Sequence, residues 1–273
     1  MNTPNNRQKG KQQCVLILIT CLVFSLVFQA QQQACASALS SIGLHVIPYP
    51  RQVYLEGEDF SFSGELTLVL GPGCSEADRF AAQELAGDLK SGWGIHAVLS
   101  EKQGERSVVL TRKDGSGVLK PQGYQLKTTE REVLISAKDE AGLFYGTRTF
   151  LQLIQKTSEG FRVPGLHIPD WPDIEKRAVH YDTKHHQDRR SYVESFIKDL
   201  AHYKINQLVW EWEDKLAYES HPEIGAPGAF TIQEMQDFTR FAKKYHVELV
   251  PGAGSGACEF YIKMAAIQTF KRN

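Results

Sequence analysis

Four charged side chains stand near the ends of two apolar segments in the second half of the chain: Arg177, Asp182, Glu211 and Asp214. A guanidinium can hold two neighbouring hydroxyl groups through parallel hydrogen bonds, which fixes the position of the ring that carries them. Carboxylates accept further hydrogen bonds from hydroxyls. These residue types indicate a binding site for a hydroxyl-rich ligand, with Arg177 as the strongest candidate.

Other kinds of site are disfavoured by spacing. His185 and His186 are adjacent, and neighbouring residues rarely bind one ion; no HxxxH or carboxylate spacing accompanies them. The sequence contains no glycine-rich phosphate loop and no Gly-x-Ser-x-Gly elbow. We therefore predict a site without a metal ion and without a cofactor.

The candidate residues lie in a region where strands and helices alternate. Such alternation favours a parallel sheet, and a barrel and a doubly wound sheet both fit it. In a βα-barrel the carboxyl ends of the strands carry the chemistry, and the three acids lie at such ends. The predicted strands are 178–182, 206–212 and 247–251, and the predicted helices are 190–203 and 231–245.

The first half of the chain, 44–165, is predicted to be a small α+β domain. Its apolar patterns indicate three strands and two helices. A connector with three prolines and a glycine, 164–172, separates it from the second half. The strands are predicted at 65–70, 107–111 and 132–137, and the helices at 75–90 and 141–155.

Composition limits the cellular setting and the partners. The 273 residues carry a formal net charge of −1, which gives no indication of a nucleic-acid or membrane-surface partner.

Residues 1–38 have a basic start, an apolar run and small residues near Ala36, the order of a secretory signal peptide. We expect an exported protein, periplasmic or extracellular, with no membrane association after cleavage. Only Cys74 and Cys258 follow the signal, too few for a disulfide framework.

Five segments, taken in order, resemble the family 20 glycoside hydrolases, the β-N-acetylhexosaminidases. The resemblance implies a small α+β N-terminal domain followed by the first three strands of a (β/α)8 TIM barrel, at 173–251. It also implies that Arg177 holds hydroxyls of a terminal N-acetylhexosamine and that Asp214 supports the same network. Glu211 stands where the family usually has histidine, which suggests a divergent branch. The segments are 142–153, 168–172, 176–182, 204–214 and 231–251.

The resemblance implies a reaction that this chain cannot complete by itself. The family cleaves with an adjacent Asp-Glu pair after the fourth barrel strand, and the substrate's own acetamido oxygen attacks the anomeric carbon. The chain stops before that strand, and its Asp139-Glu140 dipeptide precedes a helix, where we expect polar surface. The full-length parent is expected to remove terminal GlcNAc or GalNAc from a glycan substrate. The chain itself is expected to be inactive, and residues 252–273, which abandon the barrel pattern, are expected to result from a frameshift.

Two alternatives stay open. The parent could be another glycoside hydrolase with a similar front domain, such as an α-glucuronidase or an O-GlcNAcase-like enzyme. The chain could also be a non-catalytic carbohydrate-binding module, because fold does not fix function. The carbohydrate-site prediction makes one geometric demand: Arg177 and Asp214 must face a common hollow of the size of a sugar.

Overall fold

A computed structural model describes residues 38–112, 120–183 and 186–252. The predicted signal peptide, up to residue 37, and the predicted frameshifted tail, from residue 253, lie outside this part. The chain divides into two compact units, Met1–Leu44 and His45–Asn273. The described end of the first unit holds a 3₁₀ turn, Ser40–Ile42, closed by Gly43 in the left-handed conformation.

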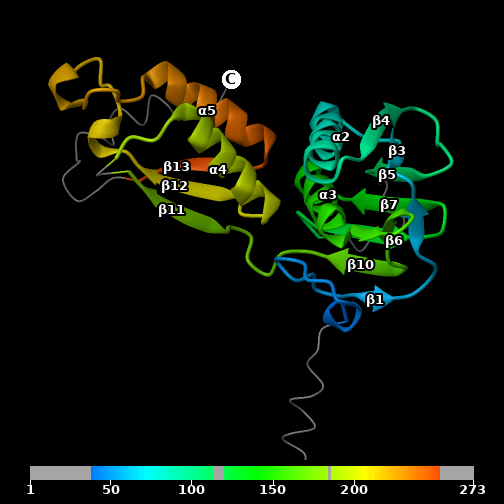
Figure 1. Ribbon diagram of the computed structural model, residues 1–273. Coiled ribbons are helices and arrows are strands. Elements are labelled where there is room, and N and C mark those ends of the chain that lie inside the picture. The colour runs from blue at the N-terminus through cyan, green and yellow to red at the C-terminus, as the bar shows by residue number, and fades with distance from the viewer. Residues whose placement is uncertain (1–37, 113–119, 184–185, 253–273) are drawn as a thin grey trace, which may run out of the picture. The chain divides into compact units, whose positions relative to one another are not determined.

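The second unit contains a mixed sheet with two helices on one face (Figure 1). The helices are α2 (Glu76–Asp88) and α3 (Glu140–Leu153). Within the described residues the strand order is β1 (Tyr54–Leu55), β10 (Leu166–Asp170), β6 (Tyr124–Thr128), β7 (Glu132–Ala137), β5 (Ser107–Thr111), β3 (Glu65–Leu70) and β4 (His96–Ser100). The pairs among β7, β5, β3 and β4 are parallel, whereas the pairs that β6 and β10 make are antiparallel.

The predicted connector is part of this sheet, which corrects the predicted domain limit of 165. β10 lies inside 164–172 and pairs along its length with β6, and its residues Leu166, Ile168 and Asp170 are buried in alternation. Pro169 is tolerated there because β1 pairs only with His167 and Leu166, so β10 has a free edge at the proline. The prolines predict a linker, but the alternating burial of this segment is that of a strand.

Side-chain caps start both helices that cover this sheet. Ser75 and Asp78 form a capping box at α2, at the helix start expected from the sequence. At α3, Asp139 accepts hydrogen bonds from the backbone N–H groups of Gly142 at 2.8 Å and Gln122 at 2.6 Å. Asp139 of the Asp139-Glu140 dipeptide is therefore a half-buried helix cap, which corrects the expectation of polar surface for this residue, whereas Glu140 is exposed as expected.

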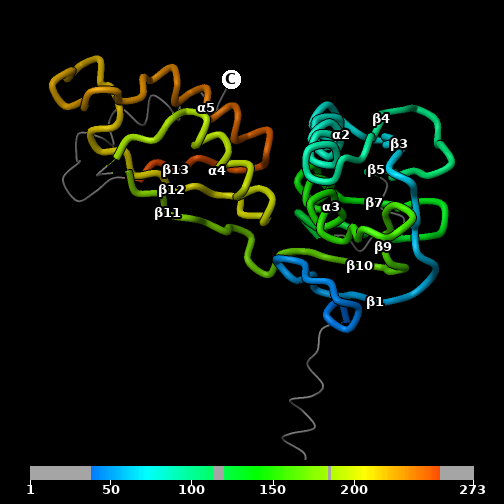
Figure 2. Tube along the Cα trace, in the orientation of Figure 1, coloured from blue at the N-terminus to red at the C-terminus, as the bar shows by residue number. Residues whose placement is uncertain are grey.

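The second predicted sheet has the expected order. β11 (Ala178–Asp182), β12 (Gln207–Glu211) and β13 (Glu248–Gly252) pair in parallel in that order. α4 (Arg190–His202) and α5 (Ile232–Lys244) connect them, as the tube in Figure 2 traces. A further small sheet of β2 (Phe60–Phe62), β9 (Gly160–Val163) and β8 (Gln155–Thr157) completes the strands of the described residues.

Trp210 of β12 and Trp212, which follows the strand, lie in the core. Trp210 is 1% exposed and Trp212 is 4% exposed, and the Trp210 ring contacts Tyr181 and Phe238. Neither indole is available to stack on a ligand, and the Trp210 ring packs α5 against the sheet. Across the described ranges, no helix combines the length and apolar character needed to cross a membrane.

Candidate functional site

The carboxyl ends of the three parallel strands bring two of the predicted acids together. Asp182 of β11 is in register with Glu211 of β12, and Gly252 of β13 follows on the other side. Residues in register on neighbouring parallel strands point to the same face, so the two carboxylates are neighbours. The structure thus places Asp182 and Glu211 at one edge, as strand-end reasoning expects.

Glu211 has a partner that sequence reasoning missed. His180 Nε2 lies 3.1 Å from Glu211 Oε2, with side-chain exposures of 57% for the histidine and 9% for the glutamate. His180 lies two residues before Asp182, so strand alternation alone assigns it to the same face. The sequence therefore contains the signal for this pair.

Asp214 lies just beyond the same edge, in a 3₁₀ turn, Glu213–Lys215. Its carboxylate is half-exposed and pairs with Lys215 Nζ at 2.5 Å. Its backbone carbonyl accepts a hydrogen bond from the N–H of Ala226 at 2.7 Å. Asp214 is therefore held in place by the long loop that follows it, while its side chain keeps access to solvent.

Arg177 lies at the opposite end of the sheet, so the predicted carbohydrate pocket formed by Arg177 and Asp214 together is wrong, and only the acids Asp182, Glu211 and Asp214 remain at the strand ends. It precedes the first residue of β11, whereas Asp214 follows the last residue of β12. A strand of this length separates its ends by roughly 13–17 Å. The guanidinium donates to the carbonyls of Lys204 at 2.6 Å, Ile174 at 2.8 Å and Glu175 at 3.1 Å.

These bonds give Arg177 a structural part in a joint between the two sheets. Its fourth hydrogen bond, from Nη2 to Gln122 Oε1 at 2.8 Å, reaches the segment that precedes β6. Asn206 Oδ1 accepts from the N–H of Arg177 at 2.7 Å, and its amide donates to the Glu175 carbonyl at 2.7 Å. Arg177, which the family resemblance suggested as a ligand residue, instead fastens the start of the parallel sheet together with Asn206.

A buried ion pair forms the centre of the same joint. Lys204 Nζ donates to Asp170 Oδ2 at 2.9 Å and to the Tyr124 hydroxyl at 3.0 Å. The Tyr124 hydroxyl donates to Asp170 at 2.8 Å, and Lys204 and Asp170 are 5% and 7% exposed. Burial lowers the pKa of Lys204, although the Asp170 carboxylate opposes the shift.

His246 is a second titratable group packed between the sheets. Its ring contacts Phe144 at 5.4 Å and Tyr145 at 6.4 Å between centroids. Burial lowers the pKa of His246, and nearby Glu140 opposes that shift. The histidine follows α5 in the left-handed conformation, so the backbone turn places it against α3.

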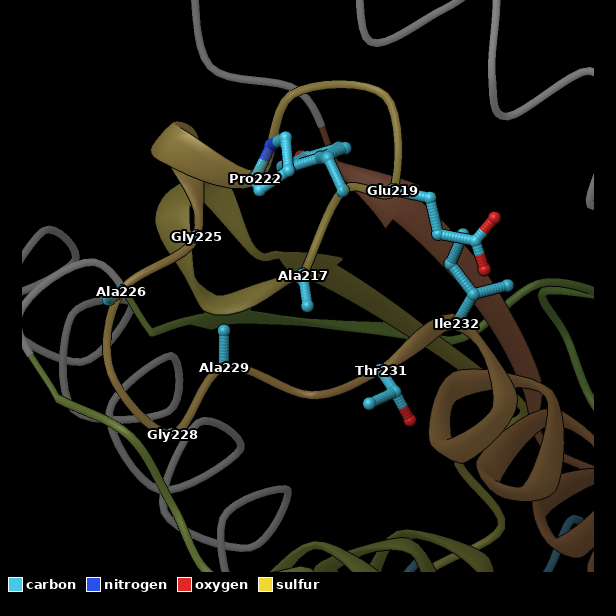
Figure 3. Close-up of a pocket in the computed structure, with 10 residues that line it drawn as sticks. Ala217, Glu219, Pro222, Gly225, Ala226, Gly228, Ala229, Thr231 and Ile232 are labelled. Carbon is cyan, nitrogen blue, oxygen red and sulfur yellow. The ribbon is translucent and has the colours of Figure 1, made fainter.

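The loop between β12 and α5 lines an open hollow of about 420 Å³. The methyl groups of Ala217 and Ala229 point into it from opposite arms of the loop (Figure 3). Tyr218, Pro222 and Ile232 also line it. The hollow belongs to the same loop that binds the Asp214 carbonyl, and it is large enough for a small ligand.

No metal centre emerges from the described ranges, where no three His, Cys, Asp or Glu side chains converge. His186 instead contacts Asp188 at 3.1 Å, and Asp188 also accepts the hydroxyl of Tyr181. His185, the other residue of the pair, lies outside the described residues.

Comparison with known proteins identifies a consistent set of relatives. Residues 43–171 match the profile described as glycosyl hydrolase family 20, domain 2. A beta-hexosaminidase of Porphyromonas gingivalis is 24% identical over 77% of this chain and 30% of its own length. A beta-N-acetylhexosaminidase of Cellulomonas fimi is 30% identical over 63% of this chain and 35% of its own length. The chain thus spans only about a third of these relatives.

Solved structures extend the likeness into the second sheet. A Streptomyces plicatus beta-hexosaminidase mutant in complex with GlcNAc aligns with a TM-score of 0.66 and 26% identity, over 76% of this chain and 45% of its own. A Flavobacterium johnsoniae chitobiase aligns with a TM-score of 0.66 and 22% identity, over 76% of this chain and 34% of its own. An alignment over 76% of the 273 residues is longer than the 129 residues of 43–171, so residues beyond the first domain contribute to the alignment.

Proposed function

We propose, from the premise that this chain belongs to glycoside hydrolase family 20, that it forms the substrate-binding front part of a β-N-acetylhexosaminidase. The parent enzyme would remove terminal GlcNAc or GalNAc from glycans. The observation that carries the proposal is the alignment with a hexosaminidase structure that holds GlcNAc, over 76% of this chain. The relatives' names favour this activity over an α-glucuronidase or an O-GlcNAcase-like enzyme.

The parallel sheet is the part of this proposal that positions substrate. We take β11, β12 and β13 as the first three strands of a (β/α)8 barrel, whose carboxyl ends would form the floor of the site. Asp182, Glu211 and Asp214 lie at or just beyond those ends, and their oxygens can accept hydrogen bonds from sugar hydroxyls. Arg177 would have a structural part only, at the joint that holds the amino end of β11 away from the substrate.

The chemical step would need groups that this chain does not supply. In substrate-assisted hydrolysis the acetamido oxygen of the sugar attacks the anomeric carbon, and a carboxylic acid protonates the leaving oxygen. The chain would bind and orient the terminal sugar, and the general acid and its neighbouring aspartate would come from a fourth strand. By itself the chain would bind GlcNAc without turnover.

Export is the second part of the proposal. The parent would act outside the cytoplasm, because residues 1–38 have the order of a signal peptide. N-terminal sequencing of the protein recovered from the medium or the periplasm tests this. An intact Met1 on the recovered protein contradicts it.

Binding and turnover by the purified chain test the proposal together. GlcNAc is expected to bind, with glucose as the control that lacks the acetamido group, and no product is expected from a chromogenic N-acetylglucosaminide. Asp214→Asn should weaken GlcNAc binding about tenfold, the effect of losing roughly 1.4 kcal/mol of interaction. Glu223→Gln, a similar change on an exposed acid of the same loop, should leave binding unchanged. Equal binding of GlcNAc and glucose contradicts the proposal, and measurable turnover contradicts the assigned inactivity.

A further inference from the structure

A second open hollow lies at the amino ends of β5 and β7, in the large mixed sheet. Segments 103–107 and 129–132 line this polar hollow, and its volume is about 720 Å³. The first segment ends the loop that joins β4 to β5, and the second is the turn between β6 and β7. Gln122 of the joint precedes β6, so the length of that strand, roughly 13–17 Å, separates the joint from the turn.

Local hydrogen bonds hold both walls of the polar hollow in shape. The N–H of Thr129 donates to the carbonyl of Glu132 at 2.9 Å, and the N–H of Glu132 donates to Thr129 Oγ1 at 3.1 Å. In the facing loop, Ser107 Oγ accepts the N–H of Gly104 at 2.9 Å. Gly104 packs directly on the sheet, because an added Cβ would clash with Thr67 Oγ1. The walls therefore have their shape without a ligand.

Two side-chain bonds join the walls and fix a guanidinium between them. Arg106 Nη1 donates to the carbonyl of Glu130 at 3.0 Å, and Gln103 Nε2 donates to Glu132 Oε2 at 2.9 Å. Arg131, in the turn, is exposed and also lines the hollow. Within the part of the chain that the structure describes, neither Arg106 nor Arg131 forms an ion pair with a carboxylate. Both guanidinium groups can therefore accept an anionic ligand.

The acids of the lining restrict which anion suits the polar hollow. A planar guanidinium binds a carboxylate through two parallel hydrogen bonds. Glu105, Glu130 and Glu132 also line the hollow, and their carboxylates repel additional negative charge while they accept hydrogen bonds from hydroxyls. A ligand with a single carboxylate and several hydroxyls satisfies both kinds of side chain, whereas a compact dianion such as sulfate meets only repulsion from the glutamates.

The rest of the lining excludes other ligand classes. Every residue in 103–107 and 129–132 is polar or glycine, so a lipid or an aromatic ring would find no apolar wall. Across the described ranges no three His, Cys, Asp or Glu side chains converge on a possible metal site, so the three glutamates do not form one. The hollow thus suits a ligand that is polar on all sides.

We propose that the polar hollow binds a sugar acid, a pyranose ring with one carboxylate. The carboxylate pairs with Arg106 and Arg131, and the ring hydroxyls donate to the glutamates. A free sugar acid and a uronic-acid unit of a glycan share this chemistry. The inference does not rest on the proposed function, because the hollow lies at the end of the large sheet opposite the joint with the parallel strands.

Titration calorimetry of the full chain with glucuronate tests the proposal. Glucose, which lacks the carboxylate, and acetate, which lacks the ring, are the controls. Glucuronate is expected to bind about tenfold more tightly than either. Methyl β-glucuronide represents a unit within a glycan: binding of both glucuronides assigns a glycan unit, and binding of free glucuronate alone assigns the free sugar acid.

Variants of the two arginines locate the binding. Arg131→Gln removes an exposed guanidinium and should weaken glucuronate binding about tenfold, with unchanged circular dichroism. Arg79→Gln, the same change on an exposed arginine of α2, is the matched control and should leave the affinity unchanged. Arg106→Gln should also weaken binding, and if loss of its bond to Glu130 disturbs the fold, Arg131→Gln decides alone.

Several results would overturn the site. Equal affinities for glucuronate and glucose, or tighter binding of inorganic phosphate than of glucuronate, would remove the sugar acid as the ligand. An affinity for glucuronate that is the same in Arg131→Gln as in Arg79→Gln would remove the hollow as its location. Displacement of glucuronate by saturating GlcNAc, or its loss in Asp214→Asn, would assign the binding to the strand ends instead. None of these results bears on whether GlcNAc binds, so the proposed function is judged separately.

Discussion

Replacement of Lys204 by methionine should destabilise the chain strongly, because it leaves the Asp170 carboxylate buried without its cation. The two side chains are 5% and 7% exposed, and Nζ lies 2.9 Å from Oδ2. Removing one partner of a buried ion pair typically costs about 3–5 kcal/mol. The Tyr124 hydroxyl and the N–H of Arg51 still donate to Asp170, so we expect the lower end, about 3 kcal/mol.

The position of Lys204 supports a specific need for this side chain. It follows α4 with a φ of 61°, a left-handed conformation that glycine adopts without strain. A lysine there bears a cost of order 1–3 kcal/mol, which the Asp170 contact offsets. Methionine keeps most of the apolar stem and the strained backbone, so the variant reports the loss of the charge.

Urea unfolding followed by circular dichroism measures the effect. With an urea dependence of about 1–3 kcal/mol per molar, the midpoint should fall by roughly 1–3 M. Lys198→Met is the matched control: Lys198 Nζ lies 3.4 Å from Glu84 with a half-exposed side chain, and such pairs contribute about 1 kcal/mol or less. A double-mutant cycle with Asp170→Asn should show a coupling of about 0.5–3 kcal/mol. Equal effects of the two methionine variants, or an additive cycle, would refute the reasoning.

Three further predictions follow from the same structure. Arg177→Gln should lower the free energy of unfolding by about 1–3 kcal/mol through lost bonds to backbone carbonyls, with unchanged affinity for GlcNAc; normal stability with lost binding would restore Arg177 to the ligand site. Burial lowers the pKa of His246 from 6.5, so the unfolded chain binds the proton first as pH falls and stability should drop below about pH 6.5. In His246→Asn, whose asparagine also tolerates the left-handed backbone, the free energy of unfolding should fall less steeply as pH falls, by at most about 1.4 kcal/mol per pH unit. Identical dependence of the free energy of unfolding on pH in the two proteins, measured by urea unfolding, would contradict this. Thr231→Ala removes the capping box of α5 and should cost about 1 kcal/mol in urea unfolding, whereas Thr239→Ala in the same helix should cost about 0.5 kcal/mol or less.

Much of the local structure could be predicted because its causes are local. The predicted strands 65–70, 107–111, 132–137 and 178–182 coincide with β3, β5, β7 and β11. The capping box at Thr231 was read directly from the spacing to Glu234. Strand alternation and helix caps depend on neighbouring residues, so a single sequence contains the information.

The place of β10 shows where local signals mislead. Two prolines and a glycine around it suggested a linker, yet Leu166 and Ile168 are buried in the sheet. A strand forms only with a partner strand. The partner of β10 is β6, which ends at Thr128, 38 residues before β10 begins at Leu166. Pairing between distant segments is not encoded in the composition of either one alone.

The sequence by itself determined the alternation of strands and helices in the second half, the caps at Ser75 and Thr231, and the gathering of Asp182 and Glu211 at strand ends. The family, too, could be recognised from short motifs in order. Only the tertiary structure decided what those side chains touch: His180 beside Glu211, Lys204 on Asp170, and Arg177 on three carbonyls at the far end of the sheet. A residue type states which bonds a side chain can make, but the competing partners within reach depend on segments that folding brings together, and for Arg177 those partners were backbone carbonyls at the joint.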